Sequence, residues 1–373
     1  MIEKILALLS PSNLYAHPDS FLVATLSALL ICGAWRINRT GKLKNFGKEE
    51  TLPLRALLVL LVVIGHLDCE TKHVYPFLGV IHWSTPAVAV FFFMSGFGLR
   101  KVYEGLLDTG GLGKYLVRFP WRTTVRLLPP FLILGPVNAV CQCWLGKITS
   151  RTLVSKALDL SILDVPHDWY VIAIAILYTV FAVSAACFRK RGVTVAIWVL
   201  SFVLWCSTCI VFGDDKSWWH VTSLSFPIGF TFAQYERQIR SALLSRPFLV
   251  ALSVSFVEVV FLLQCKFNGV PYIRCFREPY LCAIGPMCAL VLYAFDELKR
   301  MKVLCFLGLF SYEIYLVHGI PEKMFMYVGM DGLAYIAVVF AVTIPAAWLL
   351  WKVDSFVAKS VLGGTKVPAQ TSA

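Results

Sequence analysis

Long apolar runs alternate with short polar segments along almost the whole chain. About 20 apolar residues form a helix long enough to cross the hydrocarbon core of a bilayer, and somewhat fewer suffice where the bilayer thins. Inside a membrane the backbone must satisfy its own hydrogen bonds, so each run is predicted to be a helix. We predict about eleven spans, near residues 20–35, 52–67, 83–99, 127–146, 168–187, 193–212, 220–234, 247–265, 279–295, 303–318 and 332–351.

The composition agrees with this pattern. Of the 373 residues, 58% are hydrophobic and only 15% are charged, a balance typical of integral membrane proteins. The spans leave no room for a separate soluble domain. The predicted fold class is therefore an all-α, polytopic membrane helix bundle.

The net charge of +12 has a topological explanation. About two thirds of the 34 lysines and arginines fall in loops that would share one side of the membrane. Cytoplasmic loops are enriched in these residues. We therefore expect a multi-pass protein of the cell's inner membrane, with the N-terminus outside, the C-terminus cytoplasmic and no nucleic-acid partner.

The cysteines do not point to a metal site. Most of the 12 lie inside apolar runs, where thiols pack as small hydrophobic groups. Cys206 and Cys209 have the spacing C-x-x-C, but no second pair and no nearby histidine cluster completes a zinc site. No metal is predicted.

The stretch "RALLVLLVVIGH" places a charge and a titratable ring in one apolar run, at Arg55 and His66. At 100° per residue the two side chains leave nearly the same face of a helix, separated by roughly 16 Å along its axis. Arg55 would lie just inside the cytoplasmic surface and His66 beyond the midplane. Ionisable groups at such depth typically mark a pathway or an active site, although Arg55 could also extend to the headgroups as an anchor.

These residues resemble the membrane-bound acyltransferase 3 family. Its members commonly carry R-x(10)-H in one helix and F-F-x-S-G-[FY] in the next, as in "FFFMSGFGLRK" here. The similarity continues in "VRFPWRTTVRLLPPF", "DWYVIAIAILY" and "SYEIYLVH". Each motif is weak in isolation, but five occur in the family's order.

The resemblance implies a ten-helix acyltransferase core at residues 52–352. Residues 1–51 would add one N-terminal helix and a basic cytoplasmic loop, and residues 353–373 a cytoplasmic tail. The implied reaction moves an acyl group, preferably acetyl, from cytoplasmic acyl-CoA to a hydroxyl of an extracytoplasmic glycan or lipid-linked saccharide. Acyl-CoA is a co-substrate, and no permanently bound cofactor is expected.

This chemistry suggests roles for the charged residues. His66 would act as the general base or carry the acyl group covalently, with Asp68 or Glu70 orienting its ring. Arg55, Arg100 and Lys101 would bind the donor's phosphates, for which the planar guanidinium is well suited.

Other residues are candidates for lining a substrate cavity, each beside a structural alternative. Ser95 and Gly96 would leave room for the thioester or simply allow close helix packing. Trp169 fits a sugar site or an interfacial aromatic belt. In "SYEIYLVH", an intramembrane carboxylate is costly without a partner. The expected cavity residues there are Tyr312, Glu313, Tyr315 and His318.

Two other functions fit part of the pattern. A transporter or flippase for a glycan or small anionic substrate would use intramembrane charges to line a path, but the inverted repeat common in such proteins is not evident. A structural subunit of a glycan-assembly complex would tolerate the loss of both Arg55 and His66.

Overall fold

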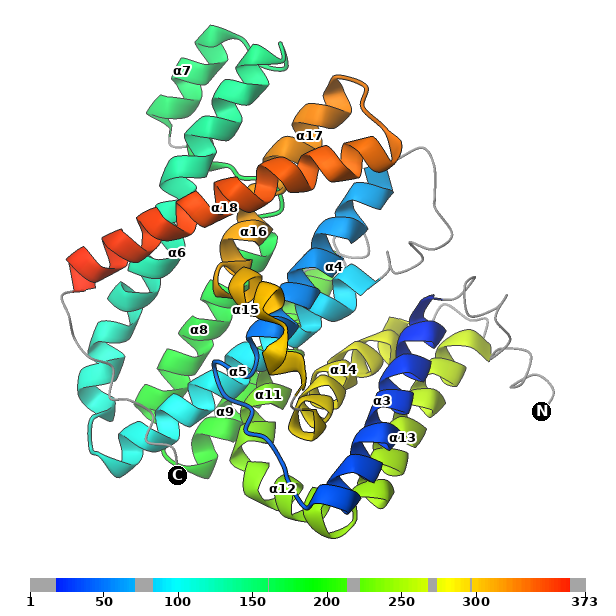
Figure 1. The fold of residues 1–373 in the computed structure, drawn as a ribbon. Coiled ribbons are helices and arrows are strands. Elements are labelled where there is room, and N and C mark those ends of the chain that lie inside the picture. Colours follow the sequence, from blue (N-terminus) through cyan, green and yellow to red (C-terminus); the bar gives the residue numbers. More distant parts are fainter. Residues whose placement is uncertain are drawn as a thin grey trace. The chain divides into compact units, whose positions relative to one another are not determined.

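The structure is a computed structural model that describes residues 18–70, 83–159, 161–212, 222–267, 274–295 and 297–362, without the side chains of residues 18, 19, 68–70, 264–278 and 299. Its regular elements within these ranges are helices, which confirms the predicted all-α class (Figure 1).

The predicted apolar runs fall largely in helices, and the run at 220–234 is helical from Ser225. The helices are α3 (Pro18–Thr40), α4 (Leu52–Glu70), α5 (Ser84–Asp108), α6 (Leu112–Trp144), α8 (Trp169–Cys187), α9 (Arg191–Phe212), α11 (Ser225–Gln234), α13 (Pro247–Phe267), α14 (Arg274–Ala294), α15 (Lys302–Leu309), α16 (Ser311–Val317) and α18 (Gly332–Leu362). Between them lie the helices α7 (Ser150–Leu158), α12 (Glu236–Ser245) and α17 (Gly319–Tyr327) and the 3-10 turns η2 (Ser161–Leu163) and η4 (Glu297–Arg300).

Some helices differ from their predicted spans. The run at 303–318 is not a single straight helix, because Phe310 leaves helical geometry at φ −124° and ψ 31°. The last helix, in contrast, continues beyond its predicted end to Leu362.

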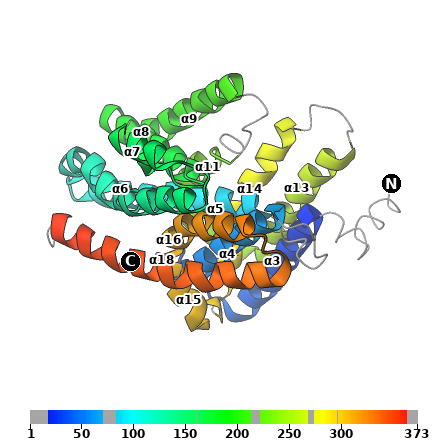
Figure 2. The ribbon, with the colours of Figure 1, turned by 90° about the horizontal axis from the view of Figure 1, so that it is seen from above.

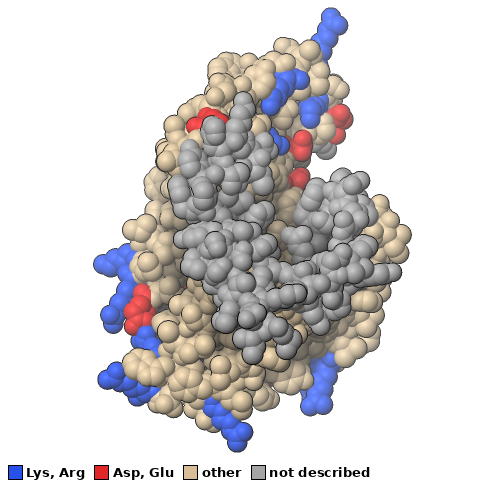
Figure 3. Space-filling model, turned by 90° about the vertical axis from the view of Figure 1, so that its right-hand side faces the viewer, with Lys and Arg blue, Asp and Glu red and all other residues tan. Residues whose placement is uncertain are grey.

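Among the described residues, 5 helices are long and apolar enough to cross a membrane, or up to 7 if each bent pair forms one span. The apolar parts of α4 and α14, Leu52–Leu67 and Pro279–Ala294, are shorter. Exposed apolar side chains such as Ile210, Phe256 and Phe356 suit contact with lipid. Much of the described surface in Figure 3 is uncharged, with lysine and arginine gathered in separate groups. The protein is a multi-pass membrane protein.

The chain forms two compact units. Unit 1 comprises Met1–Asp68, Val74–Tyr103 and Cys187–Leu309. Within it, α3 packs against α13 and α14 (Figure 1). Glycines let other helices of this unit approach closely, since a Cβ at Gly229 would lie 2.0 Å from the carbonyl oxygen of Phe93. Buried aromatic rings, among them Phe93 and Phe230, fill its core.

Unit 2 comprises Cys69–His73, Glu104–Ala186 and Phe310–Ala373. Here α16 lies beside both α6 and α18 (Figures 1 and 2). The segment before α8 packs on α6, where a Cβ at Gly135 would lie 2.4 Å from the carbonyl oxygen of Ile162. Asn138 Nδ2 donates to the carbonyl oxygen of Asp164 at 3.0 Å. These contacts hold the loop that carries His167.

Candidate active site

Arg55 and His66 lie on α4, which has no break between them. The predicted shared face and the rise of roughly 16 Å therefore hold in the folded chain. The first residue of α4 contacts α15 closely, because a Cβ at Gly308 would lie 2.0 Å from the carbonyl oxygen of Leu52. Both side chains are partly exposed. The side chains of Asp68 and Glu70, proposed to orient the ring, lie outside the described part of the structure.

Arg100 and Lys101 already have partners within unit 1. Arg100 is buried, its Nη1 donates to Thr194 Oγ1 at 3.1 Å, and its guanidinium lies 5.2 Å from the centroid of the Phe230 ring. Lys101 Nζ lies 2.5 Å from Glu236 Oε2. Their predicted role in donor binding stays a prediction, and these contacts give both residues a structural role as well.

A basic pocket in unit 1 was not predicted as a site. Its volume is about 430 Å³, and its lining includes Arg36, Lys42, Lys44, Arg240 and Tyr293. Arg240 donates to the carbonyl oxygen of Lys44, and its guanidinium lies 5.4 Å from the centroid of the Tyr293 ring. In the sequence these basic residues indicate only charged loops, because the chain separates Lys44 from Arg240 by almost 200 residues.

Ser95 and Gly96 occupy packed positions on α5. Ser95 Oγ donates to the carbonyl oxygen of Phe91 at 2.9 Å, one turn earlier. A Cβ at Gly96 would lie 2.0 Å from the carbonyl oxygen of Phe226 on α11. Gly96 thus permits close contact between the two helices, which is the structural alternative considered for it. A role of either residue in lining a cavity stays a prediction.

The motif "SYEIYLVH" is divided between α16 and the turn that follows it. Tyr312 donates its hydroxyl to the carbonyl oxygen of Leu127 at 3.2 Å, and Glu313 is buried. The Tyr315 ring contacts the Tyr170 ring edge-on, and the Tyr170 ring in turn contacts Trp169. Polar and aromatic side chains from two segments therefore meet within unit 2.

His167 precedes α8 in a left-handed backbone conformation, with φ 63°. Tyr315 donates its hydroxyl to the carbonyl oxygen of His167 at 2.5 Å. Such a φ is uncommon for a residue other than glycine, so the contacts around it must stabilise it. Burial and then the nearby Asp164 carboxylate raise the pKa of the next residue, Asp168.

His167, His318 and Glu322 come together in unit 2. The rings of His167 and His318 stack with centroids 5.1 Å apart. His167 Nε2 lies 3.1 Å from Glu322 Oε2, and His318 Nε2 lies 3.8 Å from the same oxygen. Glu322 is not among the site residues predicted from the sequence, which indicated no metal. The available signal was the i, i+4 spacing in "HGIPE", which places Glu322 one turn after His318.

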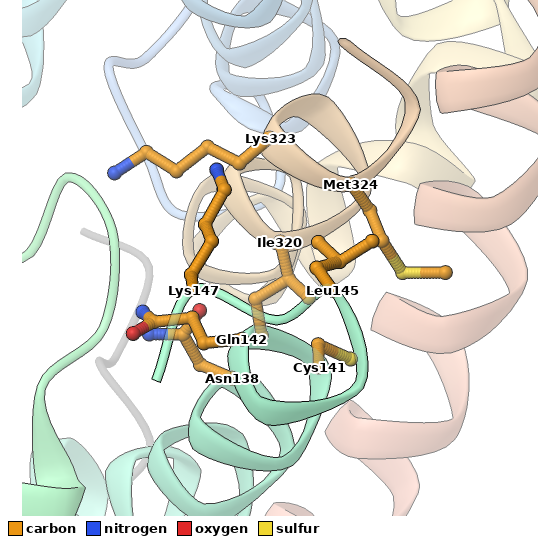
Figure 4. Close-up of a pocket in the computed structure, with 8 residues that line it drawn as sticks. All are labelled: Asn138, Cys141, Gln142, Leu145, Lys147, Ile320, Lys323 and Met324. Carbon is orange, nitrogen blue, oxygen red and sulfur yellow. The ribbon is translucent and has the colours of Figure 1, made fainter. Parts of the chain in front are cut away.

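A second pocket in unit 2, of about 230 Å³, lies between α6 and α17 (Figure 4). Asn138 and Gln142 present their amides on one side of it, and Cys141 and Met324 lie on another. The ammonium groups of Lys147 and Lys323 add two positive charges to the pocket lining. This mixture of amides, charges and apolar atoms can bind a polar, hydroxyl-bearing molecule.

The comparison with protein families decides the class. A family model described as an acyltransferase domain matches residues 54–352. The chain belongs to the acyltransferase 3 family. The match confirms the resemblance seen in the motifs and includes Arg55, His66 and the three residues of the unit 2 cluster. Comparison with curated proteins and with solved structures gave no match. The protein is accordingly a membrane acyltransferase.

Proposed function

We propose that the protein transfers an acyl group, preferably acetyl, from cytoplasmic acyl-CoA to a hydroxyl of an extracytoplasmic glycan or lipid-linked saccharide. The observation that carries this proposal is the alignment of Arg55 and His66 along α4, an unbroken helix. A pantetheine arm is of the same order of length as the roughly 16 Å between them. Phosphates held near Arg55 would therefore allow the thioester to reach His66.

His66 acts as the base in this reaction. It accepts the acceptor's hydroxyl proton as the oxygen attacks the thioester carbonyl. The carbon–sulfur bond then breaks, and the CoA thiolate leaves and takes up the proton. In the covalent alternative, the imidazole attacks first and passes the acyl group to the hydroxyl in a second step.

Two groups of basic side chains in unit 1 are candidates for the donor's phosphates. The first is Arg55 with Arg100 and Lys101, although Arg100 and Lys101 have intramolecular partners. The second is the basic pocket that includes Lys42 and Arg240. Guanidinium and ammonium groups both bind phosphate.

For the acceptor, we propose the unit 2 pocket with Asn138, Gln142 and Lys323, whose amides and charge suit a saccharide. The candidate cavity residues from the sequence keep this role as part of the proposal: Ser95, Gly96, Trp169, Tyr312, Glu313, Tyr315 and His318.

We further propose eleven spans in the cell's inner membrane, ten in an acyltransferase core at 52–352 and one before it, with a cytoplasmic tail from 353. The uneven distribution of basic residues supports an outside N-terminus and a cytoplasmic C-terminus. In this orientation Arg55 faces the donor side. Tags at residue 2, probed before and after permeabilisation, test the orientation.

The direct test of the activity uses membranes that contain the full chain, incubated with radiolabelled acetyl-CoA. We expect label in a glycan or lipid-linked saccharide fraction, and none when His66→Gln replaces the wild type at equal abundance. Absence of transfer with every acyl-CoA tried would contradict the proposal.

One observation favours a second candidate, a transporter or flippase. The helix pair Glu236–Ser245 and Pro247–Leu263, within unit 1, is bent by 115°. Interrupted membrane helices often form substrate sites in transporters. Movement of an unmodified saccharide across vesicles, in the absence of acyl-CoA, would support this candidate over acyl transfer.

A further inference from the structure

We propose that His167, His318 and Glu322 bind a divalent transition-metal ion, with Zn²⁺ as the best match. Two imidazoles and one carboxylate form a ligand set that zinc uses in catalytic sites, where a molecule from outside the set fills the fourth position. Calcium and magnesium instead prefer sites made of oxygen atoms. This proposal rests on the geometry of the cluster and is tested without an activity measurement.

The distances within the cluster suit a small ion. Zinc bonds to nitrogen and oxygen are about 2.0–2.2 Å long, so tetrahedral ligand atoms lie roughly 3.3–3.6 Å apart. The separations from Glu322 Oε2 are 3.1 Å to His167 Nε2 and 3.8 Å to His318 Nε2. All three ligand atoms lie within 4.8 Å of one another. Only small movements would bring them around one ion.

The tautomer of His318 supports the same conclusion. Its Nδ1 lies 2.5 Å from the carbonyl oxygen of Tyr315, which can only accept a hydrogen bond. Nδ1 therefore carries a proton, and in the neutral ring Nε2 keeps the lone pair that a metal ion needs. A cation between Nε2 and the Glu322 carboxylate would be attracted to both. Metal-binding histidines almost always donate their other ring N–H in this manner.

Two of the three proposed ligands are buried. His318 is 0% and Glu322 only 1% exposed, so solvent screens the lone pair and the carboxylate poorly. The carbonyl oxygen of Glu322 also accepts a hydrogen bond from the Tyr335 hydroxyl at 3.1 Å, which helps to position its helix. The two ligands are thus held by bonds from α16 and α18.

The backbone places the third ligand. His167 has φ 63°, and its carbonyl oxygen accepts the Tyr315 hydroxyl. A Cβ at Gly319 would lie 2.7 Å from Pro166 Cβ and 2.8 Å from His167 Cδ2, so glycine is needed for the His167 ring to approach. Uncommon backbone conformations of this kind often occur at ligand-binding sites.

The test measures metal content, not activity. Full-length protein is purified in detergent with an affinity tag that uses no metal, then stripped with a chelator, reloaded with Zn²⁺ and freed of excess ion by gel filtration. We expect about one tightly bound zinc per wild-type chain. We expect a loss of most of this metal in His318→Ala and Glu322→Gln, and no loss in Glu313→Gln, a buried glutamate of the same unit. Cobalt-loaded wild type should show the visible absorption of tetrahedral cobalt.

Wild-type protein that retains no metal after reloading would overturn the proposal, and this result requires no variant to fold. Folded His318→Ala or Glu322→Gln protein that keeps the wild-type zinc content would overturn it as well. A third measurement covers variants that fail to fold. Zinc should raise the melting temperature of stripped wild type, and the absence of any rise would contradict a site built into the native fold.

Discussion

Two histidine sites of this protein are built in different ways. Arg55 and His66 lie along one helix of unit 1, so their spacing follows from the pitch of α4 alone. The cluster in unit 2 joins a loop before α8 to the turn between α16 and α17, which are about 150 residues apart in the chain. The first site can be predicted from periodicity, whereas the second exists only after packing.

The two sites also differ in the burial and the contacts of their side chains. His66 and Arg55 are partly exposed on α4. His318 and Glu322 are buried, and backbone carbonyls together with the hydroxyls of Tyr315 and Tyr335 position the cluster. We infer that the first site is suited to proton transfer with a bound substrate and the second to holding an ion.

The largest effect should come from His66→Gln. Glutamine keeps hydrogen-bonding capacity but cannot take up the hydroxyl proton, so the rate of acyl transfer should fall by about 10² to 10⁴. Near-normal transfer by a normally folded His66→Gln protein would move the chemistry away from α4, and His318 with Glu313 would be examined next.

Gly319→Ala should affect only the cluster. Its Cβ would press on Pro166 and His167, displace one ligand and weaken zinc binding by about 10- to 100-fold. Gly113→Ala is the matched control, because a Cβ there meets nothing within 4 Å. Competition with a coloured zinc chelator measures both affinities. Equal affinities would show that the position of His167 does not depend on Gly319.

Arg55→Lys should raise the Michaelis constant for acyl-CoA about tenfold, equivalent to about 1.4 kcal/mol. Lysine keeps the charge but loses the two-pronged contact with phosphate. Arg118→Lys, at an exposed position on α6, is the control. An unchanged Michaelis constant for Arg55→Lys would make Arg55 a membrane anchor and favour the basic pocket as the donor site.

Glu258→Met should give the smallest change, a gain of about 1 kcal/mol in stability. Glu258 on α13 is 0% exposed, and neither carboxylate oxygen has a hydrogen-bond partner in the described structure. Glu322→Met, in contrast, should lower stability because it removes a partner of two imidazoles. Thermal melts of both proteins in detergent provide the comparison. A destabilised Glu258→Met protein would reveal a role for this carboxyl that its surroundings do not suggest.

The sequence alone determined the helical class, the family and the alignment on α4. Each depends only on residues that are close in the sequence. Apolar runs predict helices because in lipid the backbone must make its own hydrogen bonds. The fixed rise and rotation per residue of a helix align Arg55 with His66. The motifs that indicated the family are likewise continuous stretches, such as the one ending at His318. These features therefore do not depend on contacts with other segments of the chain.

Tertiary structure decided the features that depend on contacts between distant segments. The break at Phe310 divides a run that the sequence predicted as one span. Arg100 contacts Thr194 on α9 and Lys101 contacts Glu236 on α12. No residue spacing in the sequence predicts these contacts. The contact between Glu322 and His167 forms only when α16 and α17 pack beside the loop before α8. The hydroxyl of Tyr315 stabilises the left-handed backbone of His167 in that loop. Periodicity describes one helix at a time, and such sites form where several segments pack together.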